Sequence, residues 1–502
     1  MLFEETNEKV SFKDQRNYQY EEKLKDQLYE NLTFLKSLGN KEYLLFQKFE
    51  TLHDFYKNRK IKSSDISSVK TRILNKDDVY EIMNKKDNKV EIVNCSDSKE
   101  ELNTWMILRH FISSMDYKSS IGRTTKFYLK INGKIAGLIG LNSDFMTISV
   151  RDKHIGWTVA NINHDHKLNH TILGGIIVPT QPFGFSTTGG KFVTLMCLSN
   201  PLISDWENRY KDKIVVFNTT SLYGAQSQYN GMNKYFKILG ESKGNSVSIY
   251  PSQEIYLENH KYMYEIIRGI EQKIRFLTSN SKNKNDVYLL LDKILNFKKN
   301  EVVIKYQIQK KNLEDLKSLL SEDVLSQVDF SFFYEFNMCS IRPNFKTHLI
   351  NLFYKYTNFT KYLKEKNPDQ ETPEFTNNFK RGIIYSELYT NAREFLRNEI
   401  KEEDLIPRTD WDFDRNDPNS IFEYWKNKYG VKRYEKMLRE DKDNPKLSYI
   451  HFFDTPITKL INKYGSRFYS SDKKIIYDMF YDFMRFTEEN TEFSENRTIS
   501  LF

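Results

Sequence analysis

The stretch of this chain whose residue types point most directly to chemistry is 186–191, which reads Ser-Thr-Thr-Gly-Gly-Lys. An apolar run that ends at prolines precedes it, and an apolar run typical of a helix follows it. A small-residue loop that enters a helix leaves backbone N–H groups free at the positive end of the helix dipole, which suits a phosphate or pyrophosphate. The stretch therefore predicts an anion site, whose residues are Thr187, Thr188, Gly189, Gly190 and Lys191.

The same stretch also fits an ordinary helix start. Glycine lets a ligand approach the backbone closely, but it is equally common where a chain merely turns. The residues form neither a Walker A motif nor a GxGxxG fingerprint. The spacing by itself therefore leaves both interpretations open.

A second group with chemical potential is Arg151, Asp152 and Trp157. Adjacent side chains on a strand point to opposite faces, so the arginine and the aspartate need not pair. The tryptophan offers a flat face on which a nucleobase could stack. The structural alternative is a salt-bridged arginine beside a half-buried tryptophan.

A third group surrounds the second predicted strand–helix junction and contains Tyr223, Tyr229, Asn230, Asn233 and Lys234. A tyrosine hydroxyl, with a pKa near about 10, is a suitable late proton donor in a transfer reaction. The sequence does not decide between Tyr223 and Tyr229 for this role. The alternative is that these aromatic residues are structural.

Two further clusters resemble metal sites only superficially. His164, His166 and His170 fit no closed tetrahedral set, and no cysteine is near them, so we predict no structural metal there. Residues 410–420 alternate aspartates in the manner of a calcium loop. They lack the central glycine, and Ile421 stands where a glutamate is required, which predicts an acidic loop or helix cap.

The elements that must position these residues fall into regions. Residues 119–250 hold most of the glycines and read as an α/β core, with a hairpin signal at Asn132-Gly133. Within it, the order of apolar runs over 176–220 predicts strand, loop, helix and strand, with the two strands parallel and adjacent. Helical patterns predict mainly helical regions on either side, at 1–118, 251–364 and 365–502.

Composition narrows the class of protein. The chain has 502 residues, 39% of them hydrophobic, and a net charge of +8, which does not by itself indicate nucleic acid. A basic stripe at 295–312 is one candidate contact, and a solvated charged face is its alternative. The three cysteines lie far apart, which argues against a zinc ribbon or a disulfide framework and predicts a cytoplasmic location. No apolar run is long enough to predict a membrane span, and the N-terminal residues lack the apolar region of a signal peptide.

Five stretches in one order carry a family resemblance: 150–158, 169–184, 203–210, 219–224 and 235–244. Together they resemble the core domain of the DruA-type proteins of Druantia anti-phage systems and their phage-encoded relatives. That domain is in turn similar to the GNAT-like Mom proteins, which modify adenine in phage DNA.

The resemblance implies a GNAT-like α/β fold, a mixed sheet inside helical flanks. It implies that residues 187–191 would hold the pyrophosphate of acetyl-CoA or another acyl-CoA, with Tyr223 and Tyr229 near the acyl group. It favours Arg151 and Asp152 as catalytic residues. It also implies nucleic acid as a partner, through Trp157, Asn233 and Lys234, and protein partners in a defence or phage assembly.

Three hypotheses follow. The chain is an enzyme that transfers an acyl-type group to a nucleobase or a nucleic-acid-linked amine, or a non-catalytic subunit that recognises nucleic acid, or a phage accessory or virion-associated protein. The loop departs from the usual GNAT string, which favours the second hypothesis. The retained glycines and Lys191 favour the first.

Overall fold

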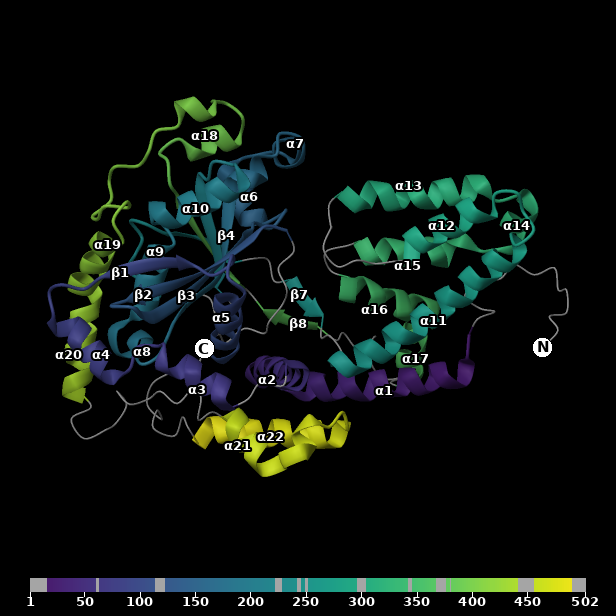
Figure 1. Cartoon of the computed structure of the whole chain (residues 1–502), viewed down its shortest axis with the longest axis horizontal. Helices are drawn as coiled ribbons and strands as arrows, with labels where there is room; N and C mark the ends of the chain where they lie inside the picture. The colour runs from purple at the N-terminus through teal and green to yellow at the C-terminus, as the bar shows by residue number, and fades with distance from the viewer. Residues whose placement is uncertain are drawn as a thin grey trace. The chain divides into compact units, whose positions relative to one another are not determined.

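A computed structural model describes residues 16–59, 63–112, 122–221, 228–241, 245–248, 252–295, 304–341, 345–366, 376–379, 381–440 and 456–489. The chain divides into two compact units. Residues 41–247 and 378–502 form what we call the sheet unit, and residues 1–40 and 248–377 form the helical unit. Figure 1 labels many of the helices and strands of both units.

The sheet unit is built on a seven-stranded mixed sheet with the order β1-β2-β3-β4-β5-β9-β6. The strands are β1 (Val90–Asn94), β2 (Thr124–Ile131), β3 (Lys134–Ser143), β4 (Thr171–Pro179), β5 (Val216–Ser221), β6 (Lys237–Glu241) and β9 (Gly382–Glu387). β4 and β5 are parallel and adjacent, which confirms the predicted strand pair, and the other pairings are antiparallel. The segment predicted as a loop after β4 instead contains a short helix, α8 (Phe183–Thr187). The β2–β3 hairpin turns at Asn132 and Gly133, both with positive φ, as predicted.

The sheet extends beyond the predicted core at 119–250. β1 comes from the predicted N-terminal helical region, and β9 comes from the predicted C-terminal one. β9 lies between β5 and β6, although more than a hundred residues separate it from both along the chain. A short strand whose partners are this distant has no neighbouring hairpin signal to reveal it.

The two faces of the sheet carry separate cores. Successive side chains of β5 point to opposite faces, so Phe217 lies in one core and Val216 in the other. The core with Phe217 includes residues of α9 (Gly189–Met196), α10 (Asn200–Tyr210) and α19 (Pro418–Trp425), and we call this side the α9 face. The core with Val216 includes residues of α6 (Ser149–Ile155) and α18 (Ala392–Leu396), and we call this side the α6 face.

Further helices complete the sheet unit. Phe46 and Phe49 of α2 pack against Phe480 of α22, with ring centroids 4.9 and 5.9 Å apart. The further helices of the sheet unit are α2 (Asn40–Arg59), α3 (Ser63–Thr71), α4 (Lys76–Asn84), α5 (Lys99–Ile112), α7 (Val159–Asn163), α8 (Phe183–Thr187), α20 (Val431–Glu440), α21 (Pro456–Tyr464) and α22 (Lys473–Glu489). Strands β7 (Asn245–Ser248) and β8 (Thr376–Phe379) form a separate two-stranded sheet.

The helical unit contains the leucine stripe expected from the sequence. Leu24, Leu28, Leu32 and Leu35 of α1 are all buried, so the stripe is a packing face. The helices of this unit are α1 (Tyr18–Ser37), α11 (Gln253–Leu277), α12 (Lys284–Leu295), α13 (Ile304–Leu319), α14 (Glu322–Gln327), α15 (Phe330–Ile341), α16 (Phe345–Tyr356) and α17 (Phe359–Lys366). Across the helices that the structure describes, none combines the length and apolar character needed to cross a membrane.

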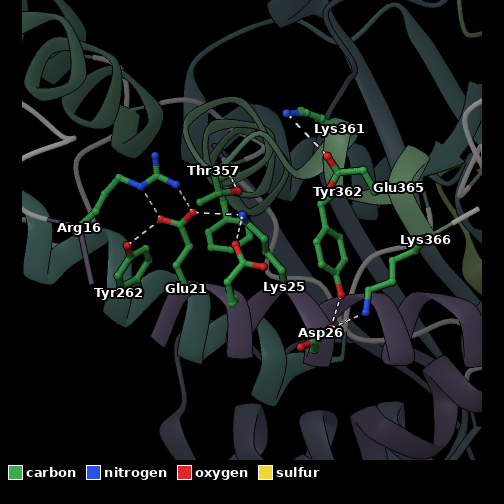
Figure 2. A network of polar contacts seen from close by, with 12 residues as sticks. Arg16, Glu21, Lys25, Asp26, Tyr262, Thr357, Lys361, Tyr362, Glu365 and Lys366 are labelled. Atoms are coloured by element: carbon green, nitrogen blue, oxygen red, sulfur yellow. Dashed lines mark hydrogen bonds and ion pairs between the residues drawn. The ribbon is translucent and has the colours of Figure 1, made fainter. Parts of the chain in front are cut away.

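A buried carboxylate ties α1 to its neighbours in the helical unit (Figure 2). Glu21 is fully buried, and its Oε2 accepts hydrogen bonds from Arg16 Nε at 2.8 Å and from the Tyr262 hydroxyl of α11 at 2.9 Å. Lys25 Nζ lies 3.3 Å from the other oxygen of Glu21. Two basic groups and a hydroxyl therefore share one buried negative charge.

Candidate functional site

The predicted group around Arg151 lies on the α6 face and forms one network. Arg151 and Asp152 belong to α6, a helix rather than the strand we assumed, and they do pair, with Arg151 Nη2 2.7 Å from Asp152 Oδ1. Arg151 Nη1 lies 2.8 Å from Asp144 Oδ2. Trp157 Nε1 donates to Asp152 Oδ1 at 3.0 Å, and the guanidinium carbon lies 5.1 Å from the centre of the Trp157 ring.

This network is buried. Arg151 and Asp144 are fully buried, and Trp157 is 7% exposed, so its ring offers little surface to a nucleobase. Asn218 of β5 donates from Nδ2 to Asp144 Oδ2 at 2.6 Å. The paired arginine and buried tryptophan match the structural alternative raised from the sequence.

Beside this network, polar groups converge on one carboxylate oxygen that the sequence analysis missed. Glu387 Oε1 accepts from the Tyr385 hydroxyl at 3.2 Å and lies 3.1 Å from Arg393 Nε and 3.8 Å from His154 Nε2. Burial raises the pKa of Tyr385 well above its ordinary value, and burial lowers the pKa of His154. Tyr385 and Glu387 belong to β9, which is far from β5 and α6 in the sequence. No local sequence pattern therefore indicated that these two side chains lie beside His154.

The predicted loop at 187–191 is a junction of two helices. α8 ends at Thr187 and α9 begins at Gly189, so only Thr188 lies between them. Thr188 has φ 57°, a left-handed conformation that β-branched residues rarely adopt. Its carbonyl accepts from Trp425 Nε1 at 3.2 Å, and the hydroxyl of Thr187 donates back to the carbonyl of Phe183.

The two glycines of this segment allow close packing against protein. A Cβ on Gly189 would lie 2.7 Å from the Phe183 ring, and a Cβ on Gly190 would lie 3.1 Å from Cβ of Gln228. Lys191 is largely buried, donates to the carbonyl of Asn230, and has its pKa lowered to about 8 by burial. The five predicted residues are thus together, but their contacts are with neighbouring side chains and backbone.

The third predicted group is divided. Tyr229 is buried in the α9-face core, where burial is the largest cause of its raised pKa. Tyr223 lies outside the described residues. Asn233 and Lys234 are exposed, and Lys234 forms an ion pair with Asp412. The site predicted from the sequence is therefore split between the α6 face and the α9 face.

Next to Lys234, cations and aromatic rings alternate. The Trp411 and Tyr235 rings are stacked with centroids 5.6 Å apart and planes 7° apart. The guanidinium carbons of Arg408 and Arg415 lie 4.5 and 5.0 Å from the centre of the Trp411 ring. We call this the cation–aromatic surface, and its members are Lys234, Arg408, Trp411, Arg415, Tyr424, Lys428 and Tyr429. Tyr235 itself is buried in the α9-face core, where it supports the Trp411 and Tyr424 rings.

The far end of this surface sits on an unusual turn. Lys428 and Tyr429 belong to a π-helical turn, η3 (Lys426–Gly430), inserted between α19 and α20. Such insertions change which way the side chains of a helix point and are frequent at functional sites. Lys428 Nζ lies 4.9 Å from the centre of the Tyr424 ring and 5.6 Å from that of Tyr429.

The acidic stretch at 410–420 contributes to this surface. Asp410 pairs with Arg408, and Asp417 caps α19 by accepting from the backbone N–H of Asn419 at 2.9 Å. The prediction of an acidic loop or helix cap is confirmed. The alternation of aromatic and charged residues around Trp411 is the signal by which the sequence could have indicated the surface.

The histidines at 164–170 have separate environments. His164 is the C-cap residue of α7, and His170 Nδ1 lies 2.7 Å from the carbonyl oxygen of Lys213. Over the part of the chain that the structure describes, there is no group of three or more metal-ligating side chains.

We expect purified protein to hold less than one zinc per chain by elemental analysis. Stoichiometric zinc that is lost in a His164→Ala, His166→Ala double variant would contradict this prediction.

Comparison with known protein families identifies a match. The model of a family described as Druantia protein DruA matches residues 40–312, which is more than half of the chain. The matched region includes β1 to β6 and ends before β9 and the Trp411 segment. No curated protein and no solved structure matches the chain.

Proposed function

The chain belongs to the family of Druantia protein DruA, which indicates a role in anti-phage defence, and from this premise we propose that it is a non-catalytic subunit that recognises nucleic acid. A member of a defence system is expected to work with protein partners. The observation that carries the proposal is the cation–aromatic surface.

The chemistry of that surface suits nucleic acid. Rings such as Tyr424 and Tyr429 give bases a stacking face, worth about 1–3 kcal/mol per base. Lys428 is exposed and can meet a backbone phosphate. Both kinds of contact are independent of a cofactor.

The packing of 187–191 favours recognition over acyl transfer. The space above Gly189 and Gly190 is occupied by Phe183 and Gln228, and Lys191 donates to a backbone carbonyl. A pyrophosphate would have to displace these contacts to reach the backbone N–H groups.

One observation supports acyl transfer as a second candidate. β4 and β5 pair only from Thr171–Val216 to Gly174–Thr219, although β4 continues to Pro179. Parallel strands that part in this way are what the GNAT resemblance implies for a cofactor slot. Acetyl-CoA or another acyl-CoA would then be the donor, with 187–191 as its anion site.

One set of titrations separates the two candidates. We expect a fluorescently labelled oligonucleotide to bind the wild-type chain, and Lys428→Glu to weaken that binding about tenfold or more, because the change removes one positive charge and adds a negative one. The matched control is Lys153→Glu, an exposed lysine on α6, which should leave the affinity unchanged. Acetyl-CoA and free CoA should give no heat in calorimetry.

The opposite pattern would favour the enzyme. CoA binding that Gly190→Asp abolishes, and Lys191→Ala only weakens, would assign 187–191 to a cofactor. No oligonucleotide binding by the wild type, or equal losses in Lys428→Glu and Lys153→Glu, would refute recognition through the cation–aromatic surface.

A further inference from the structure

Two of the four cations of the cation–aromatic surface are paired with carboxylates. Lys234 pairs with Asp412, and Arg408 Nη2 lies 2.6 Å from Asp410 Oδ2. The side chain of Asp410 is 56% exposed and that of Asp412 is 41% exposed. Carboxylates this accessible repel the phosphates of a second strand, so the surface lacks the uninterrupted positive stripe of a duplex-binding protein.

Two cations of the surface carry no such compensation. Among the described residues, no carboxylate forms an ion pair with Arg415 or with Lys428. Arg415 donates from Nε to the carbonyl of Leu198 at 2.7 Å, which fixes its guanidinium beside Trp411, and burial lowers its pKa to about 10. A planar guanidinium held in this way is suited to a single phosphate.

The rings of the surface, by contrast, pack around one buried ring. Trp411 and Tyr424 both contact the buried Tyr235, at centroid separations of 5.6 and 5.7 Å, and Tyr429 contacts Tyr424 at 6.4 Å. Tyr424 and Tyr429 meet at 82°, so the edge of one faces the other and they form a corner. The Tyr429 hydroxyl donates to the carbonyl of Gly231 at 2.9 Å, which holds its ring in place.

Half-buried rings with only two unpaired cations beside them, among the residues that the structure describes, favour single-stranded over double-stranded nucleic acid. In a duplex both faces of each base are covered by its stacked neighbours, so a protein ring has access only to bases that are unpaired or flipped out. Single-strand binding proteins combine aromatic side chains, on which bases stack, with cations that contact the backbone.

We infer that the cation–aromatic surface binds single-stranded nucleic acid, with an unstacked base against the corner of Tyr424 and Tyr429 and a backbone phosphate on Arg415. The inference rests on the proposed function and narrows it to one class of ligand. The surface would then recognise exposed bases, such as those of a displaced or unwound strand.

The experiment compares a labelled oligothymidylate of twelve nucleotides with a duplex of the same length, by anisotropy over a salt series. We expect the duplex to bind at least about tenfold more weakly. With about two phosphates neutralised, the single strand should show a shallow slope of log K against log salt, near about −1.4.

Variants of Tyr429 test the ring itself. Tyr429→Ala should weaken single-strand binding by about 5- to 150-fold, whereas Tyr429→Phe, which keeps the ring and loses only the hydroxyl, should stay within a few-fold of wild type. Near-ultraviolet circular dichroism of both variants checks that the turn is intact.

The outcomes distinguish this inference from the proposed function. Equal or tighter binding of the duplex, or an unchanged single-strand affinity in a folded Tyr429→Ala variant, would overturn the inference. If Lys428→Glu still weakened oligonucleotide binding, the proposed function, recognition of nucleic acid through this surface, would stand. Absence of binding to either oligonucleotide would overturn both.

Discussion

Replacing Arg151 by methionine should lower the free energy of unfolding of the sheet unit by about 3–5 kcal/mol. Arg151 is fully buried and contacts two carboxylates, those of Asp144 and Asp152. Methionine fills a similar volume but leaves Asp144, itself fully buried, without its cation. Removing one partner of a buried ion pair costs far more than removing both.

Amide hydrogen exchange on the full chain measures this effect, because it reports the opening of each unit separately. The loss of protection should appear in peptides of β5 and α6. Lys153→Met, an exposed substitution in the same helix, is the matched control and should change the free energy by no more than about 0.5 kcal/mol.

A second substitution tests the stated cause. Adding Asp144→Asn to Arg151→Met should recover part of the lost stability, because it removes the uncompensated charge. If the double variant were less stable than the single one by the full cost of another buried substitution, the orphaned carboxylate would not be the reason. A loss below about 1 kcal/mol in Arg151→Met would contradict the buried network as a whole.

Replacing Glu21 by glutamine should destabilise the helical unit by about 3 kcal/mol, the lower end of the range for breaking a buried pair. The charge that Arg16 and Lys25 share disappears, while the Tyr262 hydroxyl keeps an acceptor. The side chain of Arg16 is 12% exposed, so it can turn toward water, which reduces the loss of stability.

Hydrogen exchange in α1 and α11 measures this change. The control is Glu22→Gln, the next residue, whose side chain is 56% exposed and pairs with Lys25 at 2.7 Å. An exposed pair of this kind contributes about 1 kcal/mol or less. Equal losses of protection in the two variants would show that burial of Glu21 is not what makes its charge matter.

Parts of the fold were predictable because their signals are local. The alternation of apolar residues and the Asn132-Gly133 turn specify the β2–β3 hairpin within twenty residues. The order of strands over 176–220 implied a parallel pair, since a crossover through helices brings the next strand back in the same direction. The leucines of α1 marked its buried face by their helical spacing.

The candidate site was predictable only as a set of residue types. The sequence marked Arg151, Trp157, Lys191 and Lys234, but not that Arg151 and Trp157 share the α6 face while Lys191 lies against the α9 face. The small residues at 187–191 predicted an open loop, but the segment is a junction of two helices that is closed by protein side chains. Phe183 and Gln228 close over Gly189 and Gly190, and only the folded chain brings Gln228 there.

By itself, then, the sequence determined the α/β class, the parallel strand pair and the family resemblance, because each depends on patterns within a few tens of residues. The tertiary structure decided which side chains meet. Trp411 reaches Tyr235, and β9 enters between β5 and β6, across stretches of more than a hundred residues. Such contacts arise from the packing of distant segments into one core, for which no local spacing carries a signal.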